Sequence, residues 1–124
     1  LGPMDVFGGF ELRKGPPGSP PNPTWQSAQC VLTYANALHL DQLRNQTEAV
    51  GWFLSANLGT RFLAQLMIEP ASCYYMRSAQ EAVGGVRLSL WDNRLPVSPT
   101  AVSLLAITAL QEANARYDDE LEDQ

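Results

Sequence analysis

Residues 98–117 carry the strongest helix signal in the sequence, and the rest of the chain has to be arranged around it. Ser98 is a good N-cap, and Pro99 suits the first turn, where a missing amide hydrogen costs nothing. At about 100° per residue, several apolar residues of the segment share one face. They are Val102, Ala106, Ala109, Leu110, Ala113 and Tyr117. A long amphipathic helix is therefore expected here.

Three further apolar residues lie outside that face. Leu105 and Ile107 widen it towards half of the helix circumference, and Leu104 lies nearly opposite its centre. A helix this apolar is expected to be buried on more than one side. The second contact is either with the domain core or with another chain.

Apolar residues recur every three to four positions in four more segments, which predicts further helices. These segments are residues 25–38, 41–58, 61–68 and 73–83. Their expected N-caps are Thr24, Asp41, Thr60 and Ser72. Gly59 suits the left-handed residue that ends the second helix, and Pro70 stops the third.

Alternating polar and apolar residues at 86–91 predict a short strand, and Phe10–Arg13 shows a weaker alternation. The predicted fold class is all-α: a compact bundle of four to five helices around a C-terminal central helix, with at most a minor two-stranded β element. The helical domain is expected to span residues 24–117.

The two ends of the chain have distinct compositions. Leu1-Gly2-Pro3 resembles a scar of protease cleavage, and residues 4–23 form an extended arm rich in Pro and Gly. This arm is a natural candidate to reach onto a neighbouring subunit, because it is apolar at one end and extended at the other. Residues 118–124 are acidic and are expected to form a disordered tail, since negative charge opposes the dipole at a helix C-terminus.

Composition argues against several functional classes. A net charge of −5 and a pI near 4.6 disfavour a general polyanion binder. Cys30, Cys73 and the single His39 supply too few ligands for a zinc centre. Before the acidic tail no two carboxylates have a spacing that suggests a catalytic dyad, and no phosphate-binding glycine motif is present. We therefore expect no catalytic residues, no metal and no cofactor. A small enzyme of unrecognised type remains an alternative.

Apolar runs in the sequence are about half as long as a membrane span, so no membrane partner is expected. Reduced thiols and the lack of a secretory signal favour an intracellular, cytoplasmic location.

Neighbouring aromatic residues favour a protein-interaction or self-assembly module, for which a homo-oligomer is one possible form. Trp52 precedes Phe53 and the next pair is Tyr74-Tyr75, so both members of each pair are hard to bury against one neighbour. The candidate interface residues are Phe7, Phe10, Trp52, Tyr74, Tyr75, Leu104 and Ile107. The alternative is a nucleic-acid-associated protein of nucleocapsid or coat type. It would use Arg44, Arg61, Arg77, Arg87 and Arg94 together with aromatic residues.

Overall fold

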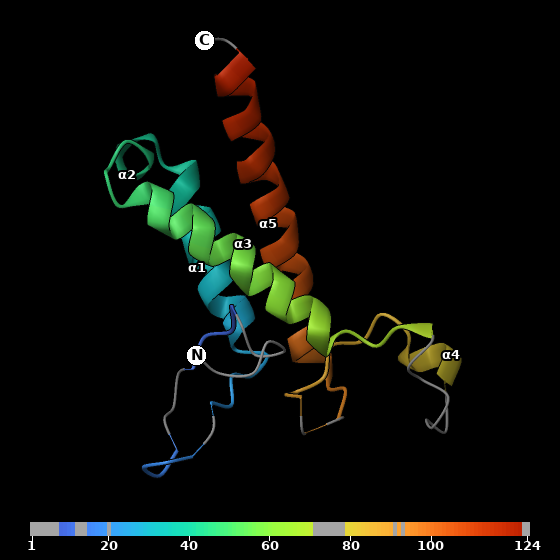
Figure 1. The fold of residues 1–124 in the computed structure, drawn as a ribbon. Coiled ribbons are helices and arrows are strands. Elements are labelled where there is room, and N and C mark those ends of the chain that lie inside the picture. Colours follow the sequence, from blue (N-terminus) through green and yellow to red (C-terminus); the bar gives the residue numbers. More distant parts are fainter. Residues whose placement is uncertain are drawn as a thin grey trace.

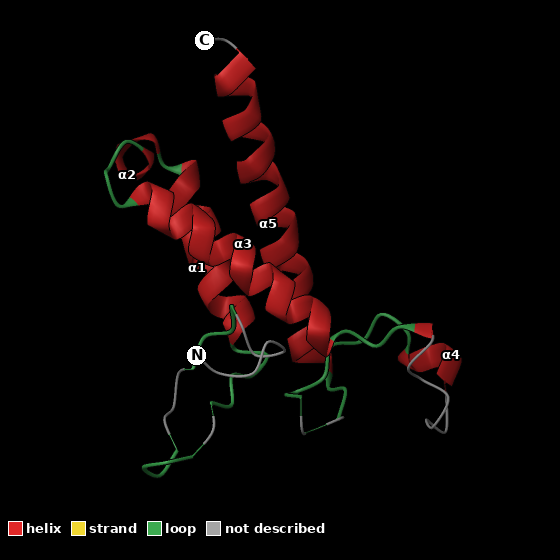
Figure 2. Ribbon diagram, viewed as in Figure 1, coloured by secondary structure: helices red, strands yellow, loops and turns green. Residues whose placement is uncertain are grey.

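The computed structural model describes residues 8–11, 15–19, 21–70, 79–90, 92 and 94–122. These residues contain five helices, shown in Figures 1 and 2: α1 (Ser27–His39), α2 (Asp41–Arg44), α3 (Ala49–Leu66), α4 (Ala79–Ala82) and α5 (Val97–Glu122). Extended pairing within the described segments is limited to isolated bridges. The predicted all-α fold is confirmed.

Helix α1 lies between the two longer helices. It runs parallel to α5 and antiparallel to α3, and it packs extensively against both (Figure 1). Direct contact between α3 and α5 is much smaller. It includes a reciprocal amide hydrogen-bond pair between Asn57 and Asn114 and a ring contact between Phe53 and Tyr117.

The central helix of the structure is thus α1, whereas the C-terminal helix was predicted to be central. Ala28, Val31 and Ala35 of α1 are fully buried, and their small side chains let α3 and α5 approach α1 from two sides. The main core adds residues from α3, α5 and the connecting segment. These are Ala56, Phe62, Leu63, Leu66, Val86, Ala106 and Leu110.

Helix α3 continues through the position where the sequence predicts a break. Gly59 is buried inside α3, and a Cβ atom there would lie 2.5 Å from Cγ2 of Val31. Thr60, the expected N-cap, donates a hydrogen bond from Oγ1 to the carbonyl oxygen of Ala56 in the preceding turn. Gly59 is therefore a point of close helix packing rather than a helix end. The break falls earlier, between Arg44 and Ala49.

The predicted strand over residues 86–91 is reduced to single bridges. Among the described residues, Val86 pairs with Met67, and Ser89 pairs with Thr24 and Asp92. The Val86–Met67 bridge ties this connection to the end of α3, and the Ser89–Thr24 bridge ties it to the segment that leads into α1. The Ser89–Asp92 bridge lies within the connection itself. The predicted helix over 73–83 appears as α4 alone, because residues 71–78 lie outside the described residues.

Helix α5 starts at Val97, which makes Pro99 its third residue, still within the turn that lacks internal amide partners. The helix continues to Glu122, although the sequence predicted an end at Tyr117 and a disordered tail. Glu and Leu are good helix formers, and the dipole penalty is only about 0.3–1 kcal/mol for an exposed charge. Continuation of the helix is therefore physically reasonable.

Ser103 of α5 provides a first test of the packing. Its side chain is almost completely buried, and its Oγ has no hydrogen-bond partner within the described part of the chain. A buried hydroxyl without a partner costs about 1–3 kcal/mol of desolvation. We expect Ser103→Ala to raise the free energy of unfolding by about 1 kcal/mol in urea denaturation. A loss of stability would mean that the hydroxyl is satisfied in solution.

Candidate protein-interaction surface

Helix α5 has a buried face and a solvent-facing apolar face. Pro99, Ser103, Ala106, Leu110 and Ala113 are buried towards the core. On the opposite side, Val97, Leu104 and Leu105 are 83%, 66% and 59% exposed. We name this side the outer α5 face and define it as Val97, Ala101, Leu104, Leu105 and Thr108, which follow one another at helical spacing.

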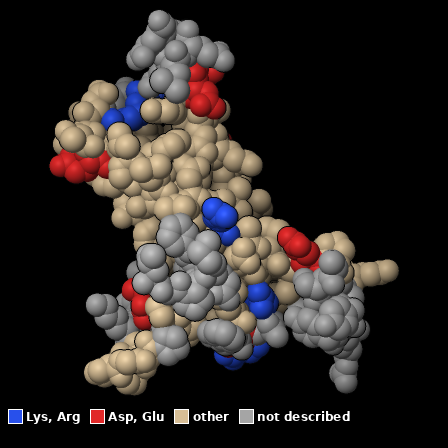
Figure 3. Space-filling view, viewed as in Figure 1, with Lys and Arg blue, Asp and Glu red and all other residues tan. Residues whose placement is uncertain are grey.

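The outer α5 face carries no charge. The sequence has no Lys, Arg, Asp or Glu between residues 95 and 111. By contrast, the solvent-facing side of α1 is polar and includes Gln29, Thr33 and Asn36. In Figure 3 the visible charged side chains lie mainly towards the two ends of the helical body. A contiguous exposed apolar stripe of this kind is typical of an interaction surface.

One of the two candidate interface residues of α5 lies on this face, and the other lies at its border. Leu104 is at the centre of the outer α5 face, and Ile107 is half-buried beside it. Leu105 was expected to widen the buried face, but the structure exposes it. The reason is that the buried arc is centred on small residues such as Ser103 and Ala106, which turn Leu105 outwards. Val97 was not among the expected interface residues, because the helix was predicted to begin after it.

Phe10 is docked within its own chain. Its amide donates to Oγ of Ser27 at 2.9 Å, and its ring lies 5.8 Å from the ring of Tyr34, measured between centroids. In this structure the arm therefore contacts α1 of the same molecule. Phe7, Tyr74 and Tyr75 lie outside the described residues.

Trp52 and Phe53 are both half-buried against one small cluster formed by Leu38, Ala49 and Ala113. From the sequence, two adjacent aromatic residues were expected to be hard to bury against the same neighbour. The small side chains of Ala49 and Ala113 leave enough space for both rings to pack beside the same cluster.

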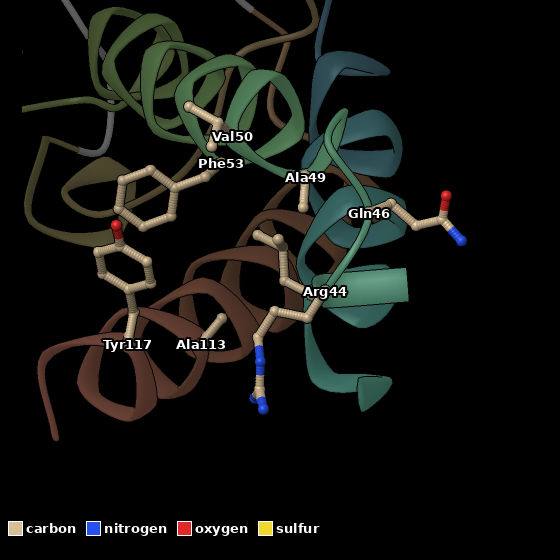
Figure 4. A pocket seen from close by; sticks show the side chains of 8 residues that line it. Arg44, Gln46, Ala49, Val50, Phe53, Ala113 and Tyr117 are labelled. Carbon is tan, nitrogen blue, oxygen red and sulfur yellow. The ribbon is translucent and has the colours of Figure 1, made fainter. Parts of the chain in front are cut away.

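The same region holds a pocket of ≈ 90 Å³ (Figure 4). Phe53 and Tyr117, with ring centroids 5.1 Å apart, form one wall, and Ala49 and Ala113 lie between the helices. The guanidinium of Arg44 points away from these rings (Figure 4). The pocket lining is thus mainly apolar, with Arg44 and Gln46 as its polar members.

His39 connects two helices. Its Nε2–H donates to the carbonyl oxygen of Ala109 at 3.1 Å, and Nη1 of Arg116 donates to the carbonyl oxygen of His39 at 3.0 Å. These bonds join the end of α1 to α5. Among the described residues, no group of three His, Cys, Asp or Glu side chains is placed to hold a metal ion.

The candidate arginines do not form a common basic surface in the described part of the chain. Arg44 lines the pocket, and Arg61 is exposed on α3. The Arg87 guanidinium donates to the carbonyl oxygens of Gln65 and Leu90. Arg94 pairs with the neighbouring Asp92 carboxylate, and Arg77 lies outside the described residues. At least two of these cations are thus engaged within the chain.

The Asp92–Arg94 pair has a measurable pH signature. Hydrogen bonds from the Arg94 side chain and amide hold the pKa of the Asp92 carboxyl below its usual value. The pair therefore contributes its full stabilisation at pH values above the ordinary pKa of an Asp carboxyl. This contribution is lost as the pH falls through the lowered pKa of Asp92. We expect Arg94→Ala to raise the Asp92 midpoint in an NMR titration. Equal midpoints in both proteins would show that the pair is not formed in solution.

Comparison with known proteins identifies no relative of this chain. No family model, curated protein or solved structure matches the chain. Among the described residues, no helix has the length and apolar character needed to cross a membrane. Functional inference therefore depends on the surface itself.

Proposed function

We propose that this chain is a non-catalytic protein-interaction module that self-associates through the outer α5 face. The observation that carries the proposal is the exposure of Val97, Leu104 and Leu105 on one uncharged helical face. Burial of apolar surface contributes about 25 cal/mol per Å², so covering these side chains favours association.

A second copy of the chain is the partner that this face fits best. Most homo-oligomers use twofold contacts, in which the same patch from each subunit meets its equivalent. The patch then has to be compatible with itself, and an uncharged face meets its copy without like-charge repulsion even though each chain has a net charge of −5. We propose that Leu104 and Leu105 lie near such a twofold axis.

A nucleic-acid role is the weaker proposal, because Arg87 and Arg94 are engaged by the chain itself. We further propose a reducing, cytoplasmic setting for the module. The free Cys30 thiol supports this location.

Sedimentation equilibrium tests the self-association. We expect the wild-type protein to dimerise with a Kd on the order of tens of micromolar, as suits a small interface. Leu104→Asp should weaken dimerisation by about 100-fold, because a twofold contact contains the substitution twice and each copy costs about 1.4 kcal/mol. Leu54→Asp is the matched control, since Leu54 is 55% exposed on α3, outside this face. A monomeric wild-type protein at several hundred micromolar would contradict the proposal.

A further inference from the structure

The N-terminal arm contains a short motif, Gly8-Gly9-Phe10, that is not part of the outer α5 face. Gly8, Gly9 and Phe10 lie against α1 and α3, beside the tight contact between Val31 and Gly59. We name the surface beneath them the arm groove. It is formed by Pro23, Ser27, Val31, Tyr34, Leu58, Gly59 and Phe62.

The arm groove binds the peptide backbone through one buried hydroxyl. Oγ of Ser27 accepts a hydrogen bond from the amide of Phe10 at 2.9 Å and donates to the carbonyl oxygen of the same residue at 3.4 Å. Ser27 is fully buried, so its hydroxyl is shielded from competing water. Main-chain bonds of this kind hold a peptide and leave the choice of sequence to the surrounding walls.

The walls leave little room for a side chain at two successive positions. Gly8 has φ +90°, and a Cβ atom there would collide with the carbonyl oxygen of Leu58. A Cβ atom on Gly9 would lie 2.7 Å from Pro23 and 3.0 Å from Phe62. A side chain at Gly8 would therefore be strained and would meet backbone, and one at Gly9 would require Pro23 and Phe62 to move.

The next position selects an aromatic ring. The Phe10 ring packs near Tyr34, and it reaches its place because Gly59 has no side chain. A Cβ atom on Gly59 would lie 3.0 Å from Cε2 of Phe10. The arm groove thus matches a Gly-Gly-aromatic segment.

The connection between Phe10 and α1 is long, and most of its described residues are exposed, although Pro23 is buried. Residues 15–19, 21 and 22 are exposed, and residues 15–23 contain five prolines. At about 3.1 Å per residue in an extended proline-rich conformation, the connection reaches roughly 40–50 Å. A domain of this length has a radius of gyration of about 14 Å. The arm can therefore reach a neighbouring molecule.

We infer that the arm groove is a peptide-binding site for an extended Gly-Gly-aromatic segment, and that the arm of a second copy can occupy it. The inference does not rest on the outer α5 face. In the isolated chain the site is filled by its own arm, whose tether supplies a high local concentration. An arm from another molecule must compete with that occupant.

A binding assay in a Leu104→Asp background tests this inference without association through α5. A fluorescent peptide with the sequence of residues 4–13 represents the second copy's arm, and anisotropy reports its binding to the full chain. We expect the Phe10→Ala chain, whose own arm is weakened, to bind at least tenfold more tightly than the chain with an intact arm. The same peptide carrying Gly9→Ala should not bind. Equal binding by both chains, or equal binding of both peptides, would overturn the inference.

Cys30 provides a second readout that does not depend on the peptide label. It lies beside Phe10 and Tyr34, and burial raises the pKa of its thiol. In a Cys73→Ser chain, Gly9→Ala should release the arm while leaving the helices intact, and should increase the alkylation rate of Cys30 several-fold. Added wild-type peptide should restore the slow rate. An alkylation rate that the peptide does not change would overturn the inference.

Discussion

Gly59→Ala is expected to lower the free energy of unfolding by about 1–3 kcal/mol, whereas Gly51→Ala is expected to raise it by about 0.5–1 kcal/mol. Both glycines are inside α3, so alanine improves helix propensity equally at each. They differ in their surroundings. A Cβ atom at Gly59 would crowd Val31 and Phe10, while one at Gly51 would meet no atom within 4 Å among the described residues.

Urea denaturation of the two variants and the wild type measures this difference. The two substitutions serve as mutual controls, because they make the same chemical change in the same helix. If Gly59→Ala proved as stabilising as Gly51→Ala, the close packing of α3 against α1 and the arm would be contradicted.

Ala106→Asp is expected to cost about 3–5 kcal/mol, enough to unfold a marginally stable domain. Ala106 is fully buried in the main core, and an uncompensated charge there would lose its hydration. Leu104→Asp, two residues earlier in α5, should change the stability of the monomer by only about 0.5 kcal/mol, because Leu104 faces solvent.

Circular dichroism and urea denaturation at low micromolar concentration, where association is negligible, separate these effects. Retained helicity in Leu104→Asp together with its loss in Ala106→Asp would agree with the described orientation of α5. Unfolding of the Leu104→Asp monomer would contradict that orientation, since it would place Leu104 in the core.

Helix content was predictable from the sequence, because apolar spacing is a local property. The spacing of Ala28, Val31 and Ala35 predicts α1, and the structure buries these residues. Gly59 was misread for a physical reason. Glycine is unfavourable inside a helix, so local rules assign it to an end, and only its contact with Val31 explains its position within α3.

The candidate surface was only partly predictable. A helical wheel places Leu104 away from the core, but it cannot tell how far the buried arc extends, and it placed Leu105 on the wrong side of that boundary. The docking site of Phe10 depends on Ser27 and Tyr34, which are distant in sequence, so no local pattern located that site. Likewise, the alternation at 86–91 identified an extended segment but not Met67 and Thr24 as its bridge partners.

Cysteine cross-linking tests the proposed self-association at the contact itself. In a chain with Cys30→Ser and Cys73→Ser, a single cysteine at Leu105 should form a disulfide-linked dimer under mild oxidation, because equivalent residues near a twofold axis meet each other. A single cysteine at Leu54, on α3, should remain largely monomeric under the same conditions. Efficient cross-linking at Leu105 alone is the result we predict; equal cross-linking at both positions, or none at Leu105, would contradict self-association through the outer α5 face.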